Sequence, residues 1–172
     1  MRGLSRAEAR RRAQALRLVL TDCDGVLTDA SVYYSAKGEE LKRFSIRDGL
    51  GVERLRKSGV ATVILSGELS PSVVLRAEKL ALRTFLGVKD KAARFGEIKT
   101  ELGVDDHEIA FIGDDVNDLG LIERLAPHGL IAAPADAQSE VRARAHFHCR
   151  IPGGQGAFRE LAEWLLELRR PA

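Results

Sequence analysis

The chain has little of what marks membrane, disulfide-rich or nucleic-acid-binding proteins. It contains only two cysteines, Cys23 and Cys149, too few for a disulfide framework. No apolar stretch approaches the ~20 residues that a membrane span requires, and the N-terminus lacks the apolar core of a secretory signal. The net charge at pH 7 is only +2, which gives no case for binding nucleic acid. We therefore predict a cytoplasmic protein with neither a membrane nor a nucleic-acid partner.

What is present is the composition of one globular domain. Of the 172 residues, 45% are hydrophobic and 30% are charged, so the chain is long enough to bury a sizeable core. We find no repeat, linker or low-complexity tract and predict one domain over residues 1–172. Arginines concentrate near the N-terminus, and we interpret them as a solvated helix face: Arg2, Arg6, Arg10, Arg11, Arg12 and Arg17.

The hydrophobic pattern predicts strands and helices in alternation. Strands are expected at 16–21, 60–65, 84–87, 109–112, 129–132 and 146–149. Helices are expected at 5–16, 48–57, 71–80, 91–102, 118–124, 137–143 and 157–169, with Ser5 and Asp48 as N-caps of the first two. Residues 31–34 and 40–44 are typical of a β-hairpin around a glycine turn at 35–39. The alternation predicts an α/β protein, a Rossmann-like doubly wound parallel sheet with a small β-hairpin insertion.

Two carboxylates follow the first predicted strand, in the string Asp22-x-Asp24-Gly25. Side chains alternate along a strand, so both carboxylates share a side, and the glycine lets the backbone turn sharply and approach a ligand. An Asp can attack phosphorus as a nucleophile, and a second carboxyl can protonate the leaving alkoxide. Alone, the string is also typical of a calcium loop, but Val26 and Leu27 stand where such a loop needs more oxygen ligands. Phosphoryl transfer is the better interpretation.

Three further predicted strands end in residues suited to the same chemistry. Ser66 and Gly67 offer a hydroxyl and backbone N–H groups to phosphate oxygens. Lys91 begins a helix and can neutralise both a carboxylate and a phosphoryl group. Asp114, in the acidic loop 113–118, would complete an oxygen-rich site for Mg²⁺. Each of these is by itself as readily a helix cap or a solvated charge, but ligands of doubly wound sheets bind beyond the C-terminal strand ends, where all four would meet.

In this order, Asp-x-Asp, Ser, Lys and Gly-Asp-Asp, the motifs resemble those of phosphatases of the haloacid dehalogenase superfamily over residues 18–165. The resemblance implies a phosphoric monoester hydrolase. It implies that Asp22 is the nucleophile and Asp24 the general acid and base. Ser66 and Lys91 would bind phosphate.

The same resemblance implies a magnesium ion as cofactor. Its ligands would be the carboxylates of Asp22 and Asp114 and the backbone carbonyl of Asp24. Asp115 and Asp118 would position the catalytic lysine or metal-bound water. The ion would act electrostatically, screening the repulsion between carboxylate and phosphate.

Many members of this superfamily carry a cap domain inserted between the motifs, and this chain has no room for one. An uncapped site must admit a large substrate or be closed by another subunit. The segments 38–42, 44–49 and 153–160 are similar to tetrameric phosphatases of 3-deoxy-2-keto sugar acids. That similarity implies a homotetramer, in which we expect the loop 153–159 to close a neighbouring site with Arg159 binding the anionic substrate.

Two substrates of that group compete. The segment from Arg47 to residue 51 is similar to 3-deoxy-manno-octulosonate (Kdo) 8-phosphate phosphatases, but those usually have Arg after Gly67, where this chain has Glu68. Glu68, followed by Arg76 and Lys79, is instead similar to 2-keto-3-deoxynononate (KDN) 9-phosphate phosphatases, where the matching residues contact the sugar acid. We favour KDN 9-phosphate, with Kdo 8-phosphate as the alternative.

The substrate contacts expected from the two resemblances are Arg47, Gly67, Glu68, Arg76, Lys79 and Arg159. For Arg76 and Lys79 a plain polar helix face is the competing interpretation. A function of another class also stays open, because domains of this fold accompany sialic acid cytidylyltransferases as non-catalytic oligomerisation domains. Degenerate motifs would favour that role, whereas every catalytic position is intact here.

Overall fold

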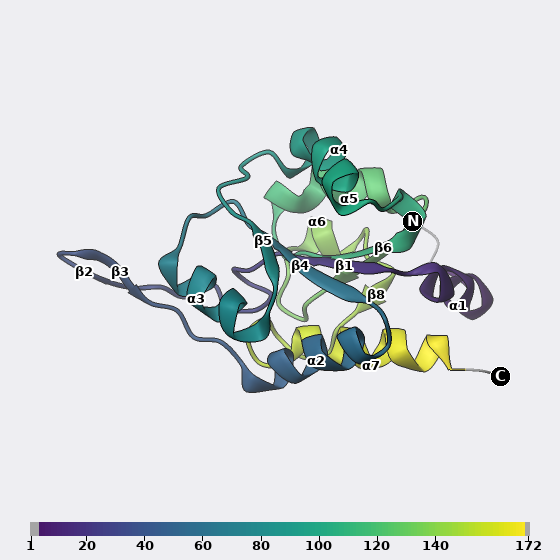
Figure 1. Ribbon diagram of the computed structural model, residues 1–172, viewed down its shortest axis with the longest axis horizontal. Helices are drawn as coiled ribbons and strands as arrows, with labels where there is room; N and C mark the ends of the chain where they lie inside the picture. Colours follow the sequence, from purple (N-terminus) through teal and green to yellow (C-terminus); the bar gives the residue numbers. More distant parts are fainter. Residues whose placement is uncertain (1–3, 171–172) are drawn as a thin grey trace.

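A six-stranded parallel sheet forms the centre of the molecule, with strand order β5-β4-β1-β6-β7-β8 (Figure 1). The computed structural model describes residues 4–170. The strands are β1 (Leu18–Thr21), β4 (Ala61–Leu65), β5 (Arg83–Phe85), β6 (Ile109–Ile112), β7 (Leu130–Ala133) and β8 (Phe147–His148). The order reverses between β1 and β6, so the carboxyl ends of these two central strands open onto a crevice. The predicted α/β fold is confirmed.

Helices cover both faces of the sheet (Figure 1). One face carries α1 (Arg6–Ala15), α2 (Ile46–Lys57), α3 (Pro71–Leu80) and α7 (Ala157–Arg169). The other carries α4 (Lys91–Leu102), α5 (Leu119–Leu125) and α6 (Ser139–Arg142). Two short 3₁₀ turns, Asp106–Glu108 and Val116–Asp118, precede β6 and α5.

The alternation of side chains along the strands divides the apolar residues between two cores. In β1, Val19 packs in the core under α2 and α7, whereas Leu18 and Leu20 pack in the core under α4 and α5. Phe111 and Ile112 of β6 divide in the same way. Because both faces are buried, the strands are apolar throughout rather than alternating.

A two-stranded hairpin, β2 (Tyr33–Ser35) and β3 (Gly38–Leu41), projects away from the sheet (Figure 1). Ser35 pairs with Gly38, so the turn is tighter than the five-residue turn predicted at 35–39. Gly38 has φ +106°, a conformation that glycine adopts without strain, and this lets the second strand begin at the glycine.

The start of α2 differs from the prediction, because Ser45 and not Asp48 is its N-cap. The Ser45 hydroxyl accepts the backbone N–H of Arg47 at 3.1 Å. Asp48 is buried inside the helix and accepts the N–H of Arg159, at the start of α7, at 2.9 Å. The carboxylate that we predicted to cap its own helix thus accepts a backbone N–H from the first turn of α7, where N–H groups have no partner within the helix.

The N-terminal arginines are only in part the solvated face that we predicted. Arg6 and Arg11 are largely exposed. Arg12, however, donates to the carbonyl oxygens of Ala126 and Gly129 at 2.9 and 2.7 Å and so fastens α1 to the loop before β7. Arg2 lies outside the described residues. Within residues 4–170, no helix has the length and apolar character needed to cross a bilayer.

Candidate active site

The loop after β1 brings its two carboxylates to the crevice at the centre of the sheet. The N–H of Asp22 donates to the carbonyl of Ile112 at 3.0 Å, which extends the pairing of β1 with β6 by one residue. The side chain of Asp22 is therefore held rigidly at the strand end and is almost fully buried.

Gly25 allows the acidic loop after β6 to approach the first motif. It has φ +80°, and a Cβ atom here would lie 1.9 Å from Oδ2 of Asp114. Any larger residue would therefore collide with the carboxylate of Asp114 and also be strained. This glycine is what lets the first and last acidic motifs meet.

Lys91 connects the loop after β1 to the acidic loop after β6. Its Nζ lies 2.6 Å from Oδ2 of Asp22 and 2.6 Å from Oδ1 of Asp118, and all three side chains are buried. The other oxygen of Asp118 accepts the N–H of Asp114 at 3.0 Å. Asp118 therefore orients both the lysine and the acidic loop. A lysine has three N–H donors, so one remains for a further acceptor such as a phosphoryl oxygen.

The site carries more negative charge than its lysine neutralises. Oxygen atoms of Asp22, Asp114 and Asp118 lie within 4.8 Å of one another. Burial, reinforced by the charge of Asp118, raises the pKa of Asp22. Burial, together with the charges of Asp22, Asp118 and Asp115, raises the pKa of Asp114 to about 8. A divalent cation would remove this penalty by favouring the ionised carboxylates.

The donor set fits magnesium. All the candidate ligands are oxygens, which Mg²⁺ prefers. Asp118 is fully buried with both oxygens engaged, whereas Asp22 and Asp114 face the cleft. The carboxylates in a position to hold the ion are thus the two that the sequence predicted, and Asp118 lies behind them.

A cleft of about 320 Å³ opens above these carboxylates. Ala30, Val116 and Asn117 form part of its wall. The predicted site residues that line it are Asp22, Asp24, Ser66, Gly67, Glu68, Asp114 and Asp115. Residues from three strand ends therefore meet in one open cleft, with Lys91 immediately beneath it.

Ser66 begins the loop after β4. Its N–H donates to the carbonyl of Phe85 at 2.9 Å, and its buried hydroxyl accepts the N–H of Glu68 at 3.2 Å. Glu68 itself is exposed at the rim, where Lys89 pairs with it at 2.6 Å. No sequence motif predicted a role for Lys89.

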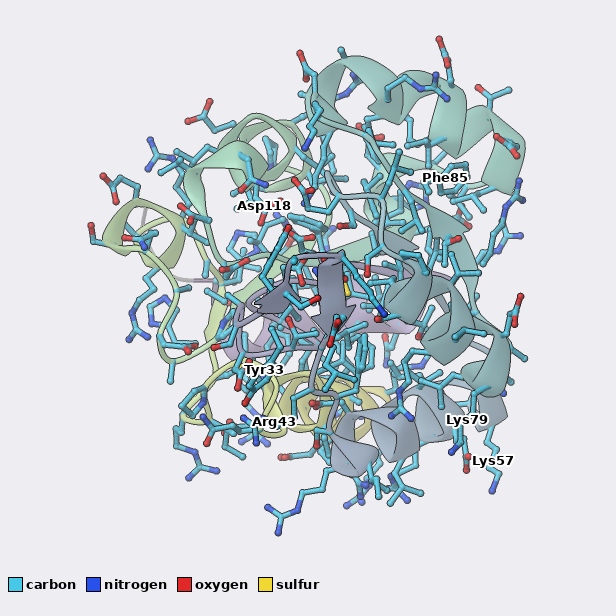
Figure 2. The ribbon with its side chains drawn as sticks, turned by 90° about the vertical axis from the view of Figure 1, so that its left-hand side faces the viewer. Tyr33, Arg43, Lys57, Lys79, Phe85 and Asp118 are labelled. Atoms are coloured by element: carbon cyan, nitrogen blue, oxygen red, sulfur yellow. The ribbon has the colours of Figure 1, made fainter. Side chains whose placement is uncertain are left out.

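The remaining predicted substrate contacts do not line the cleft. Arg76 donates to the carbonyl of Ser45 at 2.9 Å, and its guanidinium lies 5.7 Å from the centre of the Phe44 ring. Lys79 is exposed on α3, and Figure 2 shows it on the opposite side of the view from Asp118.

Arg47 and Arg159 lie at the starts of α2 and α7. Arg47 is exposed, and Nε of Arg159 pairs with Glu163 at 2.6 Å. The substrate-binding roles of these two arginines, like those of Arg76 and Lys79, stay predictions.

Lys42 is a charged residue of the site that the sequence analysis missed. Its Nζ donates to both carboxylate oxygens of Asp24, at 2.6 and 2.7 Å, and its side chain is only 2% exposed. Asp24 also accepts the hydroxyl of Thr28 at 3.2 Å. The available signals were a lysine at the base of a predicted hairpin and its place in the segment 38–42, and sequence alone does not say where a hairpin points.

The glycine loop before α7 packs against the first motif of its own chain. A Cβ at Gly153 would lie 1.9 Å from the carbonyl oxygen of Gly25, and the N–H of Gly154 donates to the carbonyl of Val26 at 2.9 Å. Both glycines are buried. The expectation that this loop closes a neighbouring site is therefore wrong for these two residues, which support the site of their own subunit.

Comparison with known proteins identifies the family. No model of a protein family matches the chain. The 3-deoxy-D-manno-octulosonate 8-phosphate phosphatase KdsC of Yersinia pestis is 35% identical over 156 residues, which cover 90% of this chain and 82% of the relative. The chain belongs to the sugar-acid phosphatases of the haloacid dehalogenase superfamily.

Solved structures of this family superpose closely on the chain. The cobalt-bound deoxy-D-mannose-octulosonate 8-phosphate phosphatase of Haemophilus influenzae matches with a TM-score of 0.86 and 35% identity, over 92% of this chain and 91% of that one. The enzyme of Moraxella catarrhalis, in complex with magnesium, phosphate and Kdo, matches with a TM-score of 0.86 and 30% identity, over 94% of this chain and 92% of that one.

The family membership confirms the predicted chemical class. The protein is a phosphoric monoester hydrolase of the sugar-acid phosphatase group. The predicted magnesium cofactor agrees with the magnesium bound in the Moraxella enzyme and with the carboxylate cluster of this chain. The preference for KDN 9-phosphate is not confirmed, because these relatives are named for the octulosonate. The alternative substrate agrees better with the comparisons.

Proposed function

We propose that the protein hydrolyses Kdo 8-phosphate through a phosphorylated Asp22. The observation that carries this proposal is the buried Lys91 bridge between Asp22 and Asp118, with Asp114 facing the same cleft. The names of the relatives support the choice of sugar acid. With its single domain over residues 1–172, the chain would supply all of the catalytic residues itself.

The reaction would proceed in two displacements. In the first, a carboxylate oxygen of Asp22 attacks phosphorus, the bond from phosphorus to the sugar oxygen breaks, and Asp24 gives its proton to the leaving alkoxide. In the second, water attacks the phosphorus of the aspartyl-phosphate and returns a proton to Asp24, which frees inorganic phosphate and restores Asp22. One water is consumed per turnover.

The other residues would hold charge and geometry. Lys91 would orient the carboxylate of Asp22 and has an N–H left for a phosphoryl oxygen, and Ser66 offers its hydroxyl to another. Bound Mg²⁺, held by Asp22, Asp114 and the carbonyl of Asp24, would supply electrostatic stabilisation of the transferring phosphoryl group. Asp118 keeps the lysine aligned, and Asp115 flanks the cleft.

Steady-state kinetics on the two sugar-acid phosphates tests the substrate. With Mg²⁺ present, we expect kcat/KM for Kdo 8-phosphate to exceed that for KDN 9-phosphate by at least about tenfold, the effect of roughly 1.4 kcal/mol of differential transition-state binding. A preference of that size for KDN 9-phosphate would instead support the second candidate. Glu68 at the rim of the cleft is the feature that favours that candidate.

We also propose that the protein is a cytoplasmic homotetramer. Support comes from large apolar side chains that one protomer leaves in solvent, because contiguous exposed apolar surface commonly marks an interface. Those on the hairpin and around the start of α3 are Tyr33, Tyr34, Leu41, Leu69 and Leu75. Light scattering should give a mass about four times that of one 18.8 kDa chain, and a monomer would contradict the proposal.

The two buried free cysteines are consistent with the reducing compartment that a cytoplasmic protein occupies.

A further inference from the structure

Lys42 occupies an unusual position for a lysine at the base of an exposed hairpin. It follows β3 directly, between two residues that face solvent, Leu41 and Arg43. The side chain of Arg43 turns outward and pairs with Asp29 at 2.7 Å. The side chain of Lys42 turns inward instead and is only 2% exposed. Lysines are almost never buried without a charged partner, and here the partner is Asp24.

The contacts of Lys42 connect the hairpin to two of the three loops that form the cleft, those after β1 and β4. Its Nζ lies 3.8 Å from Oε2 of Glu39, and Oε1 of Glu39 accepts the hydroxyl of Ser70. Ser70 is buried at the start of α3, just after the loop of Ser66. A continuous polar chain therefore runs from Asp24 through the hairpin base to Ser70, four residues after Ser66.

The carboxylate of Asp24 has few other contacts to hold it in place. Besides Lys42, only the Thr28 hydroxyl bonds to it among the described residues. Asp22 and Asp114 line the same cleft and repel a third carboxylate. The lysine is bonded to both oxygens of Asp24, and these two bonds hold the carboxyl group in its location.

We propose that Lys42 is a positioning residue that orients the carboxyl group of Asp24 toward the leaving oxygen. The inference rests on the proposed function, in which Asp24 protonates that oxygen. Lys42 touches neither the phosphoryl group nor the nucleophile in this scheme. Its removal should therefore slow formation of the aspartyl-phosphate only where the leaving group needs a proton, whereas breakdown of the aspartyl-phosphate is the same step for every substrate.

Two aryl phosphates of similar size test this inference without relying on the identity of the sugar acid. Phenolate, with a conjugate-acid pKa of about 10, benefits from protonation as it leaves, whereas p-nitrophenolate leaves readily without a proton. For Lys42→Met we expect kcat/KM on phenyl phosphate, which reports only the steps up to formation of the aspartyl-phosphate, to fall about 100-fold or more, the usual contribution of a positioned general acid. On p-nitrophenyl phosphate it should fall by less than about threefold, which also shows that the variant is folded.

Lys37→Met is the matched control, because Lys37 lies in the exposed turn of the same hairpin. It should leave both activities unchanged. A loss of equal size on both aryl phosphates for Lys42→Met, or no loss on either, would overturn the positioning role.

Asp24→Asn separates failure of this inference from failure of the proposed function. If Asp24→Asn lowers kcat/KM equally for the two aryl phosphates, then Asp24 is not the acid and the proposed mechanism fails. If it does discriminate between them, the double variant Asp24→Asn/Lys42→Met should be no slower than Asp24→Asn alone, since a residue that acts through Asp24 has nothing left to position. A further loss in the double variant would show that Lys42 acts independently and would contradict the inference.

Discussion

At the scale of single residues, Asp22 combines burial, an ion pair and a strand-end position. A neutral amide of the same shape keeps the fold but is a very poor nucleophile. For Asp22→Asn we expect kcat to fall by at least about a thousandfold, in line with the loss of a catalytic nucleophile. The melting temperature should not fall, because burial raises the pKa of Asp22 and the amide removes a charge that the fold disfavours.

Asp29→Asn provides the control for that experiment. Asp29 pairs with an exposed arginine, Arg43, and such surface pairs contribute little to stability. Its kcat should match that of the unaltered protein. Turnover of Asp22→Asn above a few per cent of that value would refute the assignment of the nucleophile.

The specificity of the site gives a second prediction at this scale, for Arg76 and Lys79. If both contact the sugar acid, each change to Ala should cost about 1.5–3 kcal/mol in kcat/KM for the preferred sugar-acid phosphate and leave p-nitrophenyl phosphate unaffected. The two residues should differ in their contribution to the stability of the fold, because Arg76 donates a hydrogen bond to the Ser45 carbonyl whereas Lys79 is exposed. Arg76→Ala should therefore lower the melting temperature, and Lys79→Ala should not. Parallel losses on both substrates would make the residues structural.

At the scale of elements, the loop before α7 and the loop after β1 depend on each other. Gly153→Ala places a methyl group where the Gly25 carbonyl oxygen already lies, so the first motif must shift. We expect a loss of about 1–3 kcal/mol in the free energy of unfolding, typical of overpacking, together with lower kcat. Denaturation with urea and the rate on p-nitrophenyl phosphate measure the two effects.

Gly96 in α4 is a suitable contrast to Gly153. A Cβ there meets nothing within 4 Å, so Gly96→Ala should stabilise the helix by about 0.5–1 kcal/mol and leave turnover alone. If the two variants behaved alike, the close approach of the two loops would have no energetic consequence.

At the scale of the whole molecule, magnesium binding should be linked to folding. A ligand that binds only the folded state at 100 times its Kd adds about 2.7 kcal/mol of stability. We expect the melting temperature to rise with Mg²⁺ and to fall in excess chelator. Asp114→Asn should lose most of this shift, and Glu53→Gln, on the exposed side of α2, should keep it. A full shift in Asp114→Asn would exclude Asp114 as a ligand.

The same carboxylates predict how stability depends on pH without metal. The pKa of Asp114 is raised to about 8 in the folded state, against about 3.9 in an unfolded chain. Between these values the folded protein binds more protons than the unfolded one, so the free energy of unfolding falls as pH rises from about 4 to about 8. Asp48, with its pKa raised by burial to about 6, acts in the same direction.

Urea denaturation at several pH values in chelator measures this dependence. The slope should become shallower in Asp114→Asn and in saturating Mg²⁺, because bound metal keeps the carboxylates ionised. Half-buried His146, with its pKa lowered by burial to about 4, acts in the opposite direction below about pH 6.5, so the comparison between variants is the decisive one. The same slope in Asp114→Asn as in the unaltered protein without metal would contradict the raised pKa of Asp114.

The sequence by itself determined the fold class and the first set of site residues. Apolar runs of four or five residues separated by helical patterns require a parallel sheet covered on both faces, and polar residues at the ends of such runs must gather at one edge. Asp22, Ser66 and Asp114 were therefore predictable from local pattern alone. These residues meet in one cleft because the strands that precede them, β4, β1 and β6, are neighbours in the parallel sheet.

Only the tertiary structure decided which long-range partners these residues have. The pairing of Lys42 with Asp24, the support of Gly25 by Gly153 and the binding of Arg76 to a backbone carbonyl all join segments that no periodicity relates. Each depends on the direction in which a hairpin, loop or helix packs after the sheet has formed. That direction is set by the sum of many contacts distributed over the chain, which no local motif encodes.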